Sequence, residues 1–102
     1  MIAARFAPRA RADILAITRW IAQENQRAAL GLRDSFSQAA ERLARYPECG
    51  AVRTELADAP IRFLVLPGQP YILVYDAGLR PPLILRVLHG ARDLPELLRD
   101  MR

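Results

Sequence analysis

Residues 71–93 of this 102-residue chain read YILVYDAGLRPPLILRVLHGARD, and this stretch decides the fold. Two almost continuously apolar runs flank a turn region that contains glycine and proline. Apolar runs of this length beside such breakers predict two buried β-strands, at residues 71–75 and 83–88. The second run leads into a polar cluster made of Arg86, His89, Arg92 and Asp93. A strand end that carries arginine and the only histidine of the chain is suited to hold an anion or a partner's acidic group.

Helical periodicity dominates the first half of the chain. Apolar residues recur at helical spacing within residues 9–23, and again from Leu32 to Leu43, which predicts two amphipathic helices. Pro8 suits the first turn of the first helix, and Asn25 suits the N-cap of the second. Because only a few residues separate the helices, we expect an antiparallel hairpin.

Shorter strands complete the expected sheet. One strand is expected at residues 2–6 and another at residues 61–66, where PGQP supplies the turn that follows. The connector at residues 47–60 is rich in turn-forming residues. A further short strand is expected within it, near residues 52–56.

The chain ends in a signal for a helix. Asp93, with Pro95 and then Glu96 behind it, has the pattern of a capping box. The apolar side chains of this terminal helix would be Leu94, Leu97, Leu98 and Met101. The expected order is β-α-α-β-β-β-α, an α+β fold with an N-terminal strand, an antiparallel helical hairpin and a curved antiparallel sheet. We expect one domain over residues 1–102.

Composition and charge narrow the class of function. A net charge of +4, from 15 basic and 11 acidic residues, favours a negatively charged partner such as nucleic acid or an acidic protein. All the basic residues are arginine, so no lysine can serve as a general base. Cys49 is the only cysteine, which excludes an intramolecular disulfide and fits a reducing compartment. No apolar run approaches the ~18 residues of a membrane span. We therefore expect a cytoplasmic protein with no cofactor, no metal and no membrane partner.

In order and spacing, these pieces resemble the RelE/ParE toxins over nearly the whole chain. The resemblance is carried by the opening strand, APRARADILAITRWIAQEN with its alanine-rich second helix, YPECGAVRTEL, IRFLVL, YILVYD and RVLHGARDL. The HGARD ending is closer to the ParE branch. The resemblance implies a toxin of a type II toxin–antitoxin pair, bound by a ParD-like antitoxin in a hetero-oligomer. It also implies that operator DNA is reached only through the antitoxin.

The resemblance leaves the target open between DNA gyrase, for ParE-like members, and mRNA on the ribosome, for RelE-like members. Cleavage of RNA by attack of a 2′-OH needs a base, an acid for the leaving oxygen and a cation that stabilises the charge of the phosphorane. RelE-like members use lysines and arginines with a late tyrosine, but this chain has no lysine and no tyrosine after Tyr75. We therefore favour a gyrase inhibitor that acts by protein binding and carries no catalytic residues.

Two alternatives stay open. The first is a YoeB-like ribonuclease, although Gly90 replaces the aromatic residue that follows the histidine in those relatives. Its catalytic set would be Glu55 or another carboxylate as base, Arg62 and Arg86 on phosphate, and His89 as acid. The second is an inactive member that binds only its antitoxin and helps to repress their shared promoter.

For the target, the candidate contact residues are Arg62, Arg86, His89 and Arg92. Arg86 shares the strand parity of Ile84 and Leu88, so it should either form an ion pair or face a groove. For His89, a structural role in the turn is an equal alternative, whereas Arg92 is expected to be exposed.

The candidate antitoxin contacts are Trp20 and Ile21 on the first helix. Tryptophan is enriched at interface hot spots. For Trp20, however, we favour packing in the core or in the hairpin over an exposed anchor.

Overall fold

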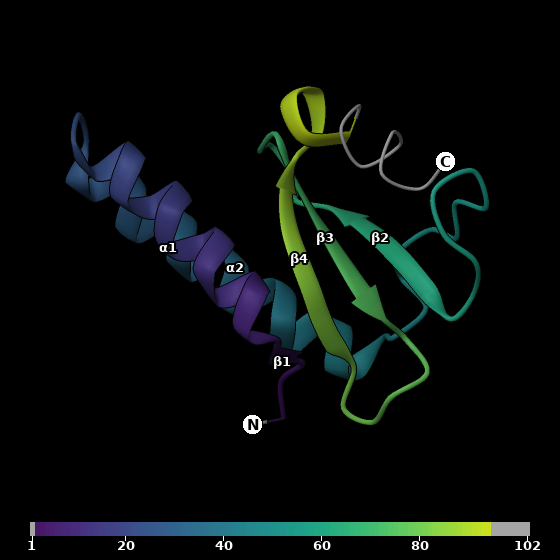
Figure 1. The fold of residues 1–102 in the computed structure, drawn as a ribbon. Helices are drawn as coiled ribbons and strands as arrows, with labels where there is room; N and C mark the ends of the chain where they lie inside the picture. Colours follow the sequence, from purple (N-terminus) through teal and green to yellow (C-terminus); the bar gives the residue numbers. More distant parts are fainter. Residues whose placement is uncertain (1, 95–102) are drawn as a thin grey trace.

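The computed structural model describes residues 2–94 (Figure 1). Its elements are, in chain order, β1 Arg5–Phe6, α1 Pro8–Ala22, α2 Gln26–Arg45, β2 Ile61–Val65, β3 Tyr71–Asp76 and β4 Leu83–His89. A helical turn at residues 90–94 follows β4. The expected α+β class and the order β-α-α-β-β-β-α are confirmed. The predicted continuation of the last helix, with Pro95, Glu96, Leu97, Leu98 and Met101, lies outside the described residues.

The two helices form the expected hairpin. Pro8 is the first residue of α1, where its missing N–H is not needed. Asn25 caps α2, because its side-chain oxygen accepts a hydrogen bond from the Ala28 N–H at 3.0 Å. The apolar stripe of α2, which includes Leu32 and Leu43, is buried. Figure 1 shows the helices side by side, with the closed end of the hairpin projecting beyond the sheet.

The strands lie in the order β1-β4-β3-β2. The pairs β2–β3 and β3–β4 are antiparallel, whereas β1 joins β4 in parallel, so the sheet is mixed. The strand predicted at residues 2–6 is only two residues long. Ala4, just before this strand, is bonded to α2 instead, because its N–H donates to the carbonyl of Ala40 at 2.8 Å.

The two faces of β3 are buried against different partners, which explains why its sequence is almost continuously apolar. Tyr71, Leu73 and Tyr75 face the helical hairpin and belong to the main core. Ile72 and Val74 face the other way. There they form a smaller cluster with Leu56, Phe63 and Leu88.

A β-bulge changes which face Arg86 occupies. Ile84 pairs with Tyr75, but Arg86 pairs with Val74, so residue 85 is an extra residue in β4. Because cross-strand partners share a face, Ile84 lies on the helix side and Arg86 on the opposite side. The prediction that Arg86 shares a face with Ile84 is therefore wrong, whereas the prediction that it shares a face with Leu88 is confirmed.

The connector between α2 and β2 contains no strand of the predicted kind. At its start, Ala51 makes an isolated bridge to Phe63 of β2. Residues 54–56, where the strand was predicted, instead form a turn in which the Leu56 N–H donates to the carbonyl of Arg53 at 2.8 Å. This turn places Leu56, only 1% exposed, in the smaller cluster.

Candidate functional site

At the end of β4, side chains of the strand and of the helical turn that follows it form hydrogen bonds with the backbone. The helical turn begins at Gly90, so His89 and not Asp93 occupies the N-cap position. The Nδ1 of His89 accepts from the Arg92 N–H at 3.2 Å, and the Asp93 carboxylate accepts from the His89 N–H at 2.7 Å. The His89 side chain thus caps the first turn, and the Asp93 side chain bonds back to the backbone N–H of His89, an arrangement related to a capping box. The prediction that Asp93 is the N-cap is wrong, because the helix begins three residues before it.

The Arg92 side chain is the exposed part of this cluster, at 64%. Its Nε donates to Asp93 Oδ1 at 3.1 Å. Burial raises the pKa of the Asp93 carboxyl, but the His89 N–H and the Arg92 guanidinium together lower this pKa below its ordinary value. The carboxylate is therefore held in its charged form, while the Arg92 side chain stays largely exposed.

Arg86 forms an ion pair with Asp13 of α1. Its Nε lies 2.8 Å from Asp13 Oδ2, and its Nη2 lies 3.2 Å from Oδ1. The Val87 N–H donates to the same Oδ2 at 3.0 Å. The Asp13 carboxylate raises the pKa of Arg86 above its ordinary value. Asp13 thus joins α1 to the edge of β4, a role that helical spacing alone did not reveal.

Arg62 holds the segment that follows α2. Its Nη1 donates to the carbonyls of Gly50 at 2.8 Å and Glu48 at 3.2 Å. Beside it, the hydroxyl of the fully buried Tyr75 donates to the carbonyl of Pro47 at 2.6 Å and accepts from the Gly50 N–H at 2.9 Å. Burial raises the pKa of the Tyr75 phenol above its ordinary value. We call this group, made of Arg62, Tyr75 and residues 47–50, the loop anchor.

The four residues proposed for a ribonuclease are not brought together. Glu55 is an exposed residue of the connector, where its Oε1 pairs with Arg53 Nε at 2.9 Å. Arg62 lies opposite Tyr75, and His89 lies opposite Tyr71. Those two rows are four residues apart along β3, or roughly 13 Å at about 3.3 Å per residue.

Arg86 is separated from His89 in another way. Its partner Val74 belongs to the smaller cluster, while Tyr71, the partner of His89, faces the hairpin. The two side chains therefore leave β4 on opposite faces. The structure brings together His89, Arg92 and Asp93, and it ties Arg62 and Arg86 to other parts of the fold.

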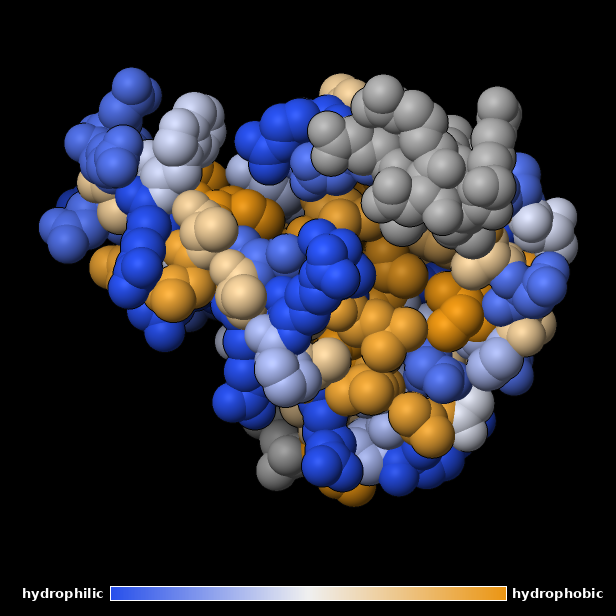
Figure 2. All heavy atoms as spheres, in the orientation of Figure 1, coloured by the Kyte–Doolittle hydropathy of each residue, from blue (hydrophilic) through white to orange (hydrophobic). Residues whose placement is uncertain are grey.

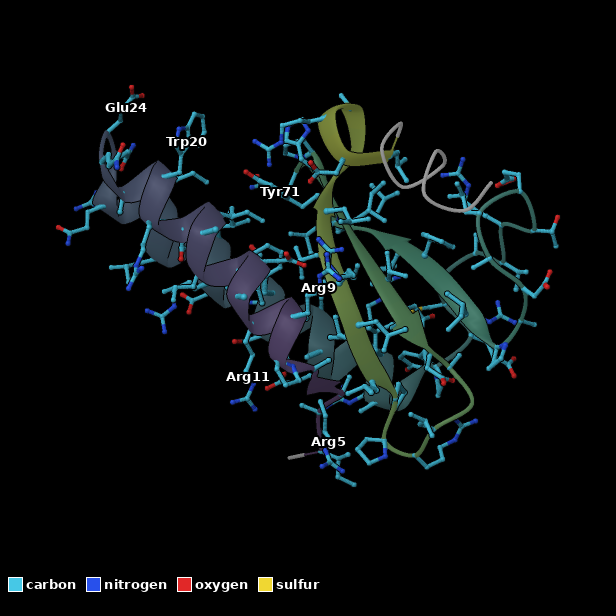
Figure 3. All side chains as sticks on the ribbon, in the orientation of Figure 1. Arg5, Arg9, Arg11, Trp20, Glu24 and Tyr71 are labelled. Carbon is cyan, nitrogen blue, oxygen red and sulfur yellow. The ribbon has the colours of Figure 1, made fainter. Side chains whose placement is uncertain are left out.

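Trp20 is 68% exposed, so the prediction that it packs in the core or in the hairpin is wrong. Its neighbour Ile21 is half-buried against the main core. Trp20 projects from the side of α1 that faces the sheet, while Tyr71 lies across from it (Figure 3). In Figure 2 the surface is hollowed between the end of the hairpin and the sheet. This hollow, which we call the α1–β4 cleft, measures about 230 Å³ and is lined by Ala16, Ile17, Trp20, Tyr71 and Arg92.

Within residues 2–94, no group of three His, Cys, Asp or Glu side chains is placed to hold a metal ion. Cys49 has a free thiol and packs against the edge of the main core. Among the helices that the structure describes, none is long and apolar enough to cross a membrane.

The fold and these surfaces define a small α+β protein in which most of the polar candidates support the fold and a few face solvent at one end of the sheet. A family model, described as the ParE toxin of the type II toxin–antitoxin system parDE, matches residues 4–94. The chain belongs to this ParE toxin family. The membership implies an antitoxin partner.

A solved structure with the same fold is described as the chromosomal ParDE TA system from P. aeruginosa. Its TM-score is 0.71, with 21% sequence identity over 87% of this chain and 96% of that chain. At this identity the likeness supports the fold alone. No curated protein matches the sequence.

Proposed function

We propose that this ParE-family toxin inhibits DNA gyrase by binding it and that a ParD-like antitoxin neutralises the toxin by covering part of its surface. The proposal rests on one observation: three of the candidate catalytic side chains already have hydrogen-bond partners within the fold. Arg62 is bonded to backbone carbonyls, Arg86 is paired with Asp13, and His89 uses Nδ1 to cap a helical turn. None of these contacts would bring a base, an acid and a phosphate-binding cation together around one phosphodiester bond of RNA.

The surface available to a target is the end of β4. Arg92 presents its guanidinium to solvent, and His89 lies beside it, half-buried, with its ring edge-on to Tyr71 at a centroid distance of 5.6 Å. An arginine with free N–H groups binds carboxylate or phosphate well. We therefore assign target contact first to Arg92 and second to His89, and we assign Arg62 and Arg86 to support of the fold.

The test is expression of the toxin without its antitoxin, followed by two assays on the purified protein. We expect it to impair supercoiling by gyrase and to leave ribosome-bound mRNA intact. Cuts in mRNA that disappear in His89→Ala would replace this proposal with the ribonuclease. Activity in neither assay, with tight antitoxin binding, would identify a member that serves only antitoxin binding and promoter regulation.

A further inference from the structure

The net charge of this protein is concentrated on one segment. Asp13 is neutralised by its ion pair with Arg86. Outside that pair, arginines and acidic residues are equal in number from residue 20 to the end of the chain, so their charges cancel. The whole net charge of +4 therefore resides on four arginines of β1 and α1, which we call the α1 basic face: Arg5, Arg9, Arg11 and Arg19.

The side chains of the α1 basic face are free to bind an external anion. All four residues are exposed. The ion pairs among residues 2–94 all involve other arginines, so none of the four has a carboxylate partner there. Figure 3 shows Arg5, Arg9 and Arg11 projecting from β1 and from the N-terminal half of α1. A guanidinium without a partner offers five N–H donors to a ligand.

The arginines of α1 frame a strip of small residues. One side of the helix carries four exposed residues at helical spacing: Arg9, Ala12, Ala16 and Arg19. At about 1.5 Å per residue, the two arginines of this strip are roughly 15 Å apart along the helix axis. The major groove of duplex DNA is about 12 Å wide and admits an α-helix. Side chains at the two ends of the strip can therefore reach phosphates on both sides of such a groove.

The composition of this face favours a polyanion over a protein or a membrane. The centre of a protein interface is rich in aromatic and bulky side chains, and a membrane-binding helix needs a broad apolar face. Here the centre is alanine, and the exposed Trp20 belongs to the α1–β4 cleft. Beside the strip, Leu15 is the bulky apolar residue, at 48% exposure. Guanidinium groups match phosphate in a forked geometry, so the surface suits nucleic acid.

The same features select duplex DNA among the nucleic acids. Single strands are usually bound by stacking of their bases on aromatic side chains, which the α1 basic face does not contain. Double-stranded RNA has a major groove too narrow for protein side chains to read. Duplex DNA combines a groove that accepts a helix with one phosphate charge per about 1.7 Å of its axis.

We propose that the α1 basic face binds the phosphate backbone of duplex DNA directly. The contact is independent of base sequence, because arginines directed at phosphates position a protein on DNA without reading it. The inference goes beyond the proposed function, in which the partners of the toxin are gyrase and an antitoxin. It gives the toxin its own contact with the DNA on which its proposed target acts.

The salt dependence of binding tests this inference. The full-length toxin, without antitoxin or gyrase, is titrated into a fluorescently labelled duplex of arbitrary sequence, and anisotropy gives Kd. Neutralisation of four phosphates predicts a slope of about −3.6 for the logarithm of the association constant against that of salt concentration. Kd should then rise by roughly 100-fold between about 50 and about 200 mM salt.

A triple variant of α1 locates the contact. It combines Arg9→Gln, Arg11→Gln and Arg19→Gln, and glutamine keeps a helix propensity close to that of arginine. Loss of three phosphate contacts should reduce the steepness of the salt dependence by about 2.7. We also expect Kd at about 50 mM salt to rise by at least about tenfold.

The matched control is a triple variant of α2 with the same net charge. It combines Arg27→Gln, Arg42→Gln and Arg45→Gln, at exposed positions of that helix. Because these residues lie outside the α1 basic face, its salt dependence should equal that of the wild-type protein, with Kd within about threefold. The thermal midpoints of both variants confirm that each is folded.

Three results would overturn the inference. The first is a wild-type protein that shows no salt-dependent binding to the duplex. The second is an equal loss of affinity in both triple variants, which would indicate a general attraction between a basic protein and a polyanion. The third is displacement of the labelled duplex by polyglutamate as effectively as by unlabelled DNA. Because the assay contains neither gyrase nor antitoxin, its failure would leave the proposed function in place.

Discussion

The two ends of the sheet use similar side chains for opposite purposes. In the loop anchor, Arg62 and Tyr75 bond to backbone groups of residues 47–50, and the Tyr75 ring is fully buried. At the end of β4, Arg92 and Trp20 are mostly exposed, although Tyr71 beside them is buried. The presence of an arginine beside an aromatic residue in the fold is therefore not evidence for either role. What separates the two regions is whether the polar atoms already have partners within the fold.

This comparison predicts that substitutions in the loop anchor reduce stability and that substitutions at the end of β4 reduce binding. The largest effect should come from Gly50→Ala. A Cβ built on Gly50 would lie 2.7 Å from the Tyr75 hydroxyl and 2.9 Å from the carbonyl of Phe63. We expect a loss of about 3 kcal/mol in the free energy of unfolding, the upper part of the range for overpacking, measured by urea denaturation.

Gly31→Ala is the matched control for that substitution. A Cβ at Gly31 of α2 would meet nothing within 4 Å. Alanine is the better helix former, so this variant should gain up to about 1 kcal/mol. A similar loss in both variants would contradict the close packing assigned to Gly50.

The second effect concerns the Tyr75 hydroxyl. Tyr75→Phe would leave the Gly50 N–H and the carbonyl of Pro47 without this partner. We expect a loss of about 2 kcal/mol, because unsatisfied buried groups cost about 1–3 kcal/mol. Tyr46→Phe, at a side chain that is 62% exposed, should stay within about 0.5 kcal/mol in the same assay. A loss in Tyr75→Phe no larger than that in Tyr46→Phe would show that the Tyr75 hydroxyl contributes little to the stability of the loop anchor.

The third effect is smaller and depends on pH. The pKa of Asp93 is lower in the folded state, so its charged form stabilises the fold above the pKa of the unfolded chain. That contribution is lost as pH falls through the folded-state pKa. Asp93→Asn should therefore cost about 1 kcal/mol at pH 7, and the difference from wild type should disappear at acidic pH. Thermal unfolding from pH 7 to pH 2 measures this. Asp34→Asn, at an exposed residue of α2, should leave the curve unchanged.

The smallest effect on stability should come with a large effect on function. Arg92→Ala should change the free energy of unfolding by no more than about 0.5 kcal/mol, because its ion pair is largely exposed. It should nevertheless reduce toxicity in cells at matched protein levels. Arg45→Ala, at the exposed end of α2, is the control. Full toxicity of Arg92→Ala would show that the target binds a surface other than the end of β4.

Much of the fold could be predicted from the sequence because local rules governed it. Helical spacing, Pro8 and Asn25 predicted the hairpin, and continuous apolar runs predicted β3 and β4 within one residue. The family resemblance carried by RVLHGARDL was confirmed by the match over residues 4–94. These features depend on residues close together in the chain, which is why a sequence reveals them.

The candidate site was less predictable because long-range contacts govern it. The bond between Arg86 and Asp13 joins residues 73 positions apart, and the bond between Tyr75 and Pro47 joins residues 28 positions apart. A single bulge placed Arg86 on the opposite face from Ile84, and a shift of four residues in the N-cap of the last helix turned Asp93 from a cap into an acceptor for His89. No spacing rule in the sequence reports such events.

By itself, the sequence determined the α+β order, the basic charge without lysine and the family of the protein. Only the tertiary structure decided which arginines are engaged in the fold and which face solvent. It also decided that Trp20 lies open beside the end of the sheet. The physical reason is that periodicity fixes which face of an element is apolar, whereas the partners of a polar atom depend on how separate elements pack together.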